Sequence, residues 1–418
     1  MRCLALALMM LMMGATALAD DSAGATTSTD MATSTDMATS TDMATSTDMQ
    51  EMAKDITAQC LLNGHAKSQH LDQVRDGNYR TFLDVSSDHG VRQLQITPPE
   101  GEAAAGILIK WRSFPLSASI QVQRGEEWVE VAYCEPEFNA QYIPLPNLTE
   151  TFRIIGRESE NTKLQICELT VVTPGKLPED FQVWQHPSAP VDLMLLSGHP
   201  DDEILWFGGL IPYYAGQELK QVVVVCATFN VYNRRLELLD CLWKCGVRVY
   251  PVFAGFEDKI TQDVNAIYAL WGRQRAFDTI AKLYRQYRPS VVVLQDEKGE
   301  YGHGVHRAFS LAGRSAVAIA ADPEKLTDSG LEPYDVPKVY MHLWKENTIT
   351  MDWHQPLSAF GGMTAQDVAR EAFKCHVSQQ GKRWQVEDGG IWDNSQFGLF
   401  HTTVGVDEKG GDMFEHID

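Results

Sequence analysis

The sequence is poor in basic residues and in long apolar runs. Its 418 residues contain 35 Lys and Arg against 56 Asp and Glu, which gives a net charge of −21 at pH 7. Phosphate backbones are bound by clustered cations, so this charge argues against nucleic acid as a partner. No run after residue 19 approaches the ~20 apolar residues that a membrane-spanning helix needs. The mature chain is therefore expected to have no transmembrane segment.

The cysteine pattern lacks any zinc-finger spacing. Of the 8 cysteines, only Cys3 precedes residue 19. The remainder is an odd number, so at least one thiol would stay unpaired or bond to another chain in an oxidising compartment. Cys241 and Cys245 lie on one expected helix, where buried free thiols are the favoured interpretation.

The N-terminal residues are typical of a secretory signal. Arg2 precedes the apolar residues 3–13, and residues 17–19 (Ala-Leu-Ala) fit a small-x-small cleavage site. Residues 1–19 are therefore expected to be removed, and the mature protein to be secreted or located at the cell surface. In residues 20–54 the segment Thr-Ser-Thr-Asp-Met recurs, which predicts a disordered linker that cannot bury enough surface to fold.

Residues 55–173 have the period-two alternation of half-buried strands. Segments such as 119–123 (Ser-Ile-Gln-Val-Gln) and 128–131 (Trp-Val-Glu-Val) alternate apolar and polar side chains, and turns such as 124–126 (Arg-Gly-Glu) separate them. Many short alternating strands predict an all-β sandwich of the jelly-roll type. Residues 174–190 contain several prolines and are expected to be a linker.

The pattern changes in residues 191–418. Near-continuous apolar strands alternate with segments of helical spacing, which predicts an α/β domain. We expect a Rossmann-like, mostly parallel sheet with helices on both faces. The strands are expected at 191–196, 222–226, 249–253, 291–294 and 339–343, and the helices at 202–214, 234–245, 264–287, 306–320 and 364–375.

Two short motifs follow predicted strands of this domain. Residues 199–203 (His-Pro-Asp-Asp-Glu) come after the first strand, and residues 301–306 (Tyr-Gly-His-Gly-Val-His) come after the fourth. The carboxyl ends of parallel strands meet at one edge of a sheet, so the two motifs can converge. A hydrolytic zinc site needs three protein ligands, a position open to water and a base, and the motifs contain imidazoles and carboxylates for these roles.

The spacing within each motif supports a shared ion. His199 and Asp202 are close enough on one turn to face the same metal, and His303 and His306 lie on one side of a helical turn. An Asp-Asp turn alone is usually a helix cap, and an isolated His-x-x-His pair usually serves packing. The occurrence of both motifs together, each at a strand end of one α/β domain, favours a metal site.

Together the motifs resemble the LmbE/PIG-L family of zinc-dependent N-deacetylases, which remove acetyl groups from N-acetylglucosamine-type sugars. The resemblance extends over most of residues 191–418. Residues 234–247 are similar to the family's second helix, and residues 376–379 (His-Val-Ser-Gln) resemble its late His-x-Ser-Gln segment. The resemblance implies a Zn²⁺ cofactor and an acetylated glycan or glycoconjugate as partner.

The resemblance also implies the roles of the residues nearest the ion. His199, Asp202 and His306 would be the zinc ligands. Asp201 would be the general base, since a carboxylate beside a metal-bound water can accept its proton.

Further residues would act on the sugar and its acetyl group. His303 and Tyr301 would polarise the acetyl carbonyl and stabilise the oxyanion. Arg234 and Asp258 would contact the sugar, with an ordinary ion pair or helix cap as the alternative. For His376 a structural hydrogen bond is favoured over catalysis.

The chain departs from the family at two points. Val305 stands where many relatives have an aspartate, so no carboxylate tunes His303 from that position. Residues 228–230 (Thr-Phe-Asn) stand where relatives often have Asp-Gly-Glu. The sugar contacts are therefore less firmly implied than the metal ligands.

Residues 56–173 resemble a discoidin-like, galactose-binding-like domain, on the segments 76–81 (Asp-Gly-Asn-Tyr-Arg-Thr) and 166–171 (Ile-Cys-Glu-Leu-Thr-Val). The resemblance implies a role in carbohydrate binding. It also implies a structural Ca²⁺ with oxygen donors from this loop and strand, and a capped turn is the alternative. The donors would be Asp76, Thr81 and Glu168.

A disulfide is also expected in this domain. Cys60 and Cys167 lie near its two ends, and a bridge between neighbouring terminal strands is plausible there.

These features predict an exported zinc-dependent enzyme that removes N-acetyl groups from GlcNAc- or GalNAc-type sugars of a glycan. One alternative is a metal-dependent hydrolase of another amide or ester, because a fold does not fix the substrate. The other is a non-catalytic glycan-binding protein. The complete set of catalytic side chains favours an enzyme.

Overall fold

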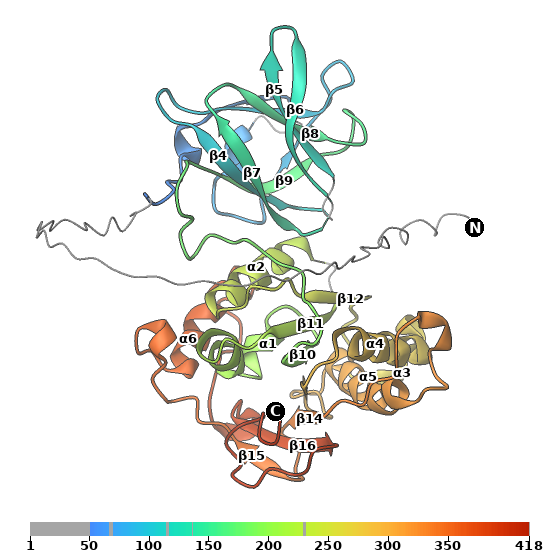
Figure 1. Cartoon of the computed structure of the whole chain (residues 1–418). Helices are drawn as coiled ribbons and strands as arrows, with labels where there is room; N and C mark the ends of the chain where they lie inside the picture. Colours follow the sequence, from blue (N-terminus) through green and yellow to red (C-terminus); the bar gives the residue numbers. More distant parts are fainter. Residues whose placement is uncertain (1–50, 67–69, 114–116, 136, 229–230, 418) are drawn as a thin grey trace, which may run out of the picture. The chain divides into compact units, whose positions relative to one another are not determined.

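The computed structural model of the chain describes residues 51–417 apart from 67–69, 114–116, 136 and 229–230 (Figure 1). The predicted signal and the repeats of the predicted linker lie outside the described residues. Residues 51–54, predicted as the end of the linker, make tertiary contacts: Ala53 is buried, and its N–H donates to the carbonyl of Lys176 over 2.9 Å. In the described part of the chain, no helix combines the length and the apolar character needed to cross a membrane.

The sandwich region consists of two antiparallel sheets, and the predicted all-β character is confirmed. Alternation sets the faces: in β3, Leu94 and Ile96 are fully buried while their neighbours are half-buried. The first sheet has the order β1 (Leu61–Gly64), β3 (Gln93–Thr97), β8 (Phe152–Gly156), β5 (Ala118–Arg124) and β6 (Glu127–Cys134). The second has the order β2 (Leu83–Asp84), β9 (Gln165–Val172), β4 (Ala104–Trp111) and β7 (Ala140–Leu148).

The expected Cys60–Cys167 disulfide is wrong, because both thiols are free. Cys60 packs in the core between the sheets, together with Ile166 of β9. Successive side chains of a strand point to opposite faces, so Cys167 faces away from that core and packs in a different apolar cluster. Cys241 and Cys245 are buried and free, as predicted.

The C-terminal half contains a seven-stranded mixed sheet. The predicted parallel strands are present with small shifts of their ends, and two antiparallel strands were not predicted. These two, β16 and β15, add to one edge of the sheet. The order is β12 (Val252–Phe256), β11 (Val222–Thr228), β10 (Leu193–Ser197), β13 (Val291–Leu294), β14 (Lys338–His342), β16 (Gln396–Thr402) and β15 (Thr348–Thr350).

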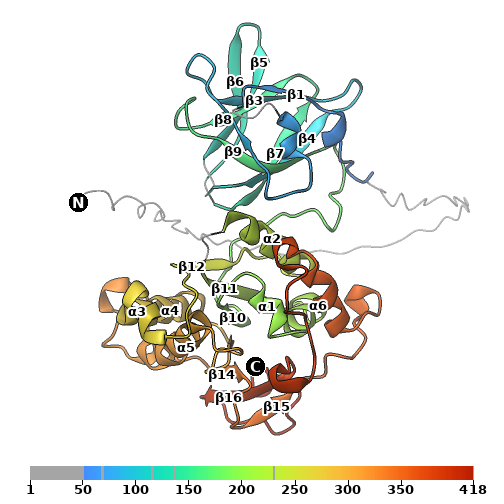
Figure 2. The same ribbon diagram turned by 180° about the vertical axis from the view of Figure 1, so that it is seen from behind.

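Helices cover both faces of this sheet, as Figures 1 and 2 show. Leu193 and Leu195 of β10 pack in the apolar cluster that contains residues of α1, α2 and α6. Met194 and Leu196 pack in the cluster that contains residues of α3, α4 and α5. The helices are α1 (Asp202–Leu205), α2 (Tyr232–Lys244), α3 (Val264–Trp271), α4 (Arg273–Tyr287), α5 (Gly304–Ala321) and α6 (Ala365–Phe373).

Two of the predicted helices are interrupted at glycines. Gly272, at φ 78°, separates α3 from α4. The helix predicted at 202–214 ends after one turn, and a π-helical turn follows at Pro212–Gln217. Between them, Gly208 has φ 50°, and a Cβ there would lie 2.4 Å from the Asn394 side chain. The close approach of Asn394 therefore requires glycine and breaks the helix.

Candidate metal centre and active site

The predicted motifs meet at the carboxyl ends of adjacent strands. β10 and β13 are parallel neighbours, with Leu195 opposite Val293. The loop after β10 carries residues 199–203 into α1, and the loop after β13 carries residues 301–303 to the start of α5. The two loops approach each other most closely at Gly198, where a Cβ would lie 2.9 Å from the His306 ring and 3.1 Å from Asp202. Glycine at this position therefore allows the two motifs to touch.

Three donor atoms converge at this crossing. His199 Nδ1 lies 3.1 Å from Asp202 Oδ2 and 3.2 Å from His306 Nε2. The distance from His306 Nε2 to Asp202 Oδ2 is 2.9 Å. Tetrahedral zinc with bonds of 2.0–2.2 Å places its ligand atoms ~3.3 Å apart. The donor set and its spacing therefore fit a divalent ion such as Zn²⁺, and a ring nitrogen of His303 also lies within 4.8 Å of those of His199 and His306.

The other polar atom of each of these three side chains also has a hydrogen-bonding partner. His199 Nε2 lies 3.0 Å from Asp258 Oδ1, and His306 Nδ1 lies 2.8 Å from Glu300 Oε2. Asp202 Oδ1 accepts a 2.7 Å hydrogen bond from the indole of Trp206. Partners of this kind fix the orientation and tautomer of metal ligands.

The charges at the centre reinforce one another. Burial alone would raise the pKa of Asp202, but the imidazoles of His306 and His199 outweigh it and hold this pKa well below its usual range. The same applies to Glu300, whose pKa is lowered by His306 and His342 despite complete burial. Both carboxylates are therefore anionic, as a divalent ion requires.

Asp201 lies beside the three donors but is held differently. Its Oδ1 accepts a 2.6 Å hydrogen bond from Arg234. Its backbone is in an unfavourable conformation, with φ 125°, and its N–H donates to Glu203 Oε2 over 2.7 Å. Burial raises the pKa of Asp201 to about 6, against the lowering effect of Arg234. This carboxylate thus lies beside the converging donors and titrates at a higher pH than Asp202.

A buried pair supports the Asp201 turn. His376 Nε2 lies 2.7 Å from Glu203 Oε1, and neither side chain is exposed. The same Glu203 carboxylate accepts the Asp201 N–H, so the pair anchors the strained turn. The predicted structural role of His376 fits this arrangement.

His303 and Tyr301 complete the other side of the centre. His303 caps α5: its Nδ1 accepts a hydrogen bond from the Val305 N–H over 3.3 Å. Nε2 must then carry the proton of the neutral ring. Burial and the neighbouring imidazoles of His199 and His306 lower the pKa of His303 to about 4. Burial raises the pKa of Tyr301, so both groups are neutral hydrogen-bond donors at the site.

Part of this half of the chain is similar to a known protein family. Residues 194–317 match the family described as PIG-L: GlcNAc-PI de-N-acetylase. Both motifs and all three converging donor atoms fall within the matched residues.

Two curated relatives share this domain. A 1D-myo-inositol 2-acetamido-2-deoxy-alpha-D-glucopyranoside deacetylase 2 from Saccharopolyspora erythraea is 30% identical over 174 residues, which are 35% of this chain and 63% of that protein. A deacetylase 1 of the same description from Catenulispora acidiphila is 26% identical over 191 residues, 39% of this chain and 59% of that protein. The chain thus spans about three fifths of the length of these relatives.

The solved structure of the N,N'-diacetylchitobiose deacetylase from Pyrococcus horikoshii is also similar. It is 18% identical and covers 45% of this chain and 70% of its own chain, with a TM-score of 0.34.

The structure brings all eight residues predicted for the catalytic site into one place. Arg234 and Asp258, predicted to contact a sugar, contact Asp201 and His199. Val305 is buried, and Thr228 donates to the carbonyl of Gly198 over 3.2 Å. The residues brought together are His199, Asp201, Asp202, Arg234, Asp258, Tyr301, His303 and His306.

Sequence reasoning missed several supporting residues. The Glu300 carboxylate hydrogen-bonds to His306 and lies 3.2 Å from His342. The Trp206 indole donates a hydrogen bond to Asp202. Glu300 directly precedes the second motif and could have been noticed as a carboxylate next to histidines. No local pattern indicates His342, because it reaches the site from β14.

The predicted calcium ligands lie together on the sandwich. Thr81 Oγ1 donates to Asp76, and the Asn78 N–H lies 2.9 Å from Asp76 Oδ1 and 3.1 Å from Glu168 Oε1. Burial and the neighbouring Asp76 carboxylate raise the pKa of Glu168 to about 7. Two adjacent carboxylates of this kind repel each other unless a proton or a cation lies between them.

Replacing His376 by leucine tests the supporting pair. His376→Leu leaves the buried Glu203 without its partner, so we expect a loss of about 3–5 kcal/mol in the free energy of unfolding. His376→Gln keeps a donor for Glu203 and should restore more than half of that loss. Urea denaturation of the two variants and the parent measures both values; equal stability of all three would show that the pair supports nothing.

Proposed function

We propose that this chain is a zinc-dependent hydrolase that removes N-acetyl groups from acetamido sugars. The observation that supports it best is the convergence of His199 Nδ1, Asp202 Oδ2 and His306 Nε2, with the Asp201 carboxylate beside them. A Zn²⁺ bound there supplies a water of lowered pKa and a Lewis acid for the acetyl oxygen.

The side chains of the site divide the work of amide hydrolysis. Asp201 accepts the proton of the attacking water and passes it to the sugar nitrogen as the C–N bond breaks, so that the nitrogen leaves as a neutral amine. His303 Nε2–H and the Tyr301 hydroxyl donate hydrogen bonds to the acetyl oxygen as it gains negative charge. The products are acetate and the free amine of the sugar. Arg234 keeps the Asp201 carboxylate aimed at the water.

The substrate class rests on the curated relatives. The names of these relatives describe deacetylases of a 2-acetamido-2-deoxy-glucopyranoside, so an N-acetylglucosamine-type sugar is the first substrate to test. Deacetylation of a GalNAc-type sugar, or hydrolysis of another amide or ester, requires the same side chains and is distinguished only by substrate screening. Binding of a glycan without turnover is the non-enzymatic alternative.

The remaining parts of the chain are interpreted around this activity. We propose that the protein is exported by its N-terminal signal and acts outside the cell. The discoidin-like sandwich would bind a glycan and hold the PIG-L domain near its substrate. Asp76, Thr81 and Glu168 would bind a structural Ca²⁺, which would relieve the repulsion between the two carboxylates.

Replacing the proposed base tests the activity. Asp201→Asn cannot accept a proton, so acetate release from N-acetylglucosamine-containing glycosides should fall by a factor of about 10²–10⁴. Zinc content should remain unchanged, because Asp201 contributes no converging donor atom. Asp328→Asn, an exposed carboxylate away from the site, is the control and should match the parent. Full activity of Asp201→Asn would overturn its role as base.

The two histidines of the second motif should separate metal binding from catalysis. His306→Ala removes a converging donor and should reduce zinc from about one ion per chain to trace levels by elemental analysis. His303→Ala should retain zinc but lose about 10²–10³-fold in kcat, since it removes only an oxyanion donor. Loss of zinc in His303→Ala would instead make His303 a ligand.

Calcium binding to the sandwich is tested by thermal unfolding. Millimolar Ca²⁺ should raise the Tm of the parent by several degrees, as expected for a ligand that binds only the folded state. Glu168→Gln removes one carboxylate and should abolish this shift. An equal shift in the variant, or none in the parent, would leave the loop as a capped turn.

A further inference from the structure

One carboxylate on α2 is bound by side chains of the sandwich. Asp240 Oδ2 accepts a 2.6 Å hydrogen bond from the Tyr79 hydroxyl, and Asp240 Oδ1 lies 2.8 Å from Lys110 Nζ. Gln182, from the segment between the sandwich and the α/β domain, donates to the same Oδ1 over 2.6 Å. The side chains of Lys110 and Asp240 are only 13% and 25% exposed, so water screens this ion pair less than it screens a surface pair.

The sandwich also contacts the first residue of α2. The Tyr232 hydroxyl donates to the carbonyl of Arg80 over 3.1 Å, and the Tyr232 ring lies 6.2 Å from that of Phe82. The guanidinium of Arg112 lies 3.8 Å from the centre of the Phe82 ring and 4.8 Å from that of the Tyr232 ring, which makes a cation–π contact with each. The sandwich therefore binds α2 at its start and again at Asp240, about two turns further on.

The sandwich and the α/β domain also share buried apolar side chains. Leu108 and Ala140 of the four-stranded sheet belong to the same apolar cluster as Leu238 of α2. Nearby, the buried N–H of Asn139 donates to the Tyr250 hydroxyl over 3.0 Å. The two regions are therefore joined by packed and hydrogen-bonded side chains, and not only by the segment of chain between them.

The same helix carries Arg234, which holds the proposed base. Arg234 donates from one nitrogen, Nη2, to both the carbonyl of Pro200 and Asp201 Oδ1. Its Nε is buried and has no hydrogen-bond partner among the described residues. A guanidinium held through a single nitrogen cannot compensate for a shift of its helix, so the location of α2 sets the distance from Arg234 to Asp201.

We propose that the sandwich is a positioning element of the active site. Through Tyr79 and Lys110 it fixes α2, so that Arg234 keeps the Asp201 carboxylate beside the metal centre. Tyr79 and Lys110 bind Asp240 and not Asp201, so they act through the helix. The inference rests on the proposed hydrolase function for its effect on the reaction rate. The sandwich would then support catalysis itself, in addition to any glycan that it binds.

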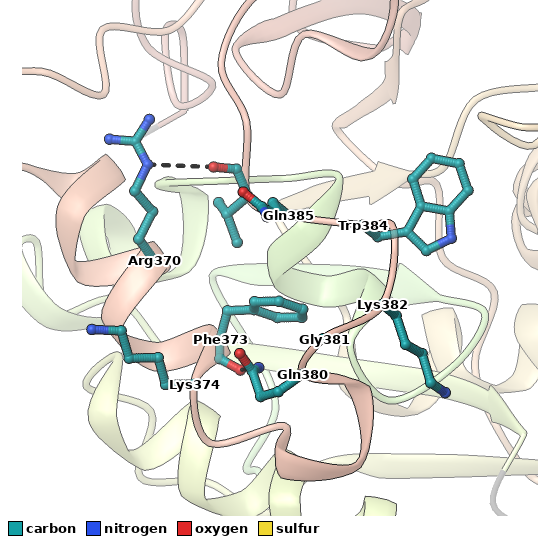
Figure 3. A pocket seen from close by; sticks show the side chains of 9 residues that line it. Arg370, Phe373, Lys374, Gln380, Gly381, Lys382, Trp384 and Gln385 are labelled. Atoms are coloured by element: carbon teal, nitrogen blue, oxygen red, sulfur yellow. Dashed lines mark hydrogen bonds between the residues drawn. The ribbon is translucent and has the colours of Figure 1, made fainter.

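A pocket beside α6 offers a control region. It has a volume of about 480 Å³ and lies between the end of α6 and the loop that follows (Figure 3). Phe373 and Lys374 line one part of it, and Lys382 and Trp384 line another. None of the nine residues that line it in the described structure belongs to α2. A substitution here therefore alters the α/β domain without removing a contact between α2 and the sandwich.

Removing both sandwich contacts to Asp240 tests the proposal. Tyr79→Phe combined with Lys110→Met preserves the size of both side chains but removes the hydroxyl and the ammonium group. A small displacement of a group that acts on the reaction costs a large factor in rate, so kcat for methyl N-acetylglucosaminide should fall about 10-fold. KM should change by less than about 2-fold and the zinc content should stay the same, because neither residue contacts the sugar or the ion. Each substitution alone should cause a smaller loss of kcat.

A further substitution shows whether the effect passes through Arg234. Arg234→Ala alone should lower kcat, and the added changes at Tyr79 and Lys110 should then lower it by less than about 2-fold more. A merely structural role of the sandwich would lower kcat by the same factor with and without Arg234. Lys374→Met is the matched control, because it removes a 2.6 Å ion pair with Glu371 at the end of α6. This variant should keep kcat within about 2-fold of the parent.

Hydrogen–deuterium exchange tests the hold on α2 without any substrate. Backbone amides of residues 232–238 should exchange about 10-fold faster in the variant with Tyr79→Phe and Lys110→Met, and at the parent rate in Lys374→Met. Unchanged exchange in α2, or an equal loss of kcat with and without Arg234, would overturn the proposal. Faster exchange in the variant together with no turnover by the unaltered protein would reject the proposed function and leave the hold on α2 established.

Discussion

The α/β half of this protein depends on the close approach of two loops at Gly198. Parallel pairing of β10 and β13 brings the loops to one sheet edge, but adjacency of strands alone leaves side chains several ångströms apart. The missing side chain at Gly198 lets the His306 ring reach Asp202 and His199. Any larger residue would separate the donor atoms of the two loops. It would also move the imidazoles away from the buried carboxylates that they keep ionised.

The crossing is stable because each buried charge has a partner on more than one side. Glu300 contacts His306 and His342, and Glu203 contacts His376 and the backbone of Asp201. Burial of a carboxylate is costly unless it is paired and hydrogen-bonded. The strained backbone at Asp201 persists for the same reason, since the surrounding contacts determine its conformation more strongly than its own preference does.

The sequence was sufficient to predict the layers of the fold and the residues at the centre. Strand ends in a parallel sheet have a fixed location, so motifs directly after 191–196 and 291–294 could be placed without a structure. The supporting residue His342 could not be placed, because it reaches the centre from β14 through tertiary packing and carries no local pattern. The breaks at Gly208 and Gly272 were missed because apolar spacing continues across them. The predicted disulfide is absent for a different reason. The prediction used only the location of both cysteines near the ends of one domain, and it left out the face of the sheet to which each strand residue points.

The contact between Trp206 and Asp202 gives the protein an internal optical reporter. The indole N–H is bonded to a carboxylate whose other oxygen faces His306. A divalent charge bound there would draw electron density from that carboxylate and weaken its hydrogen bond to the indole. The emission of Trp206 would then be expected to change with occupancy of the centre, without a label and without any substrate.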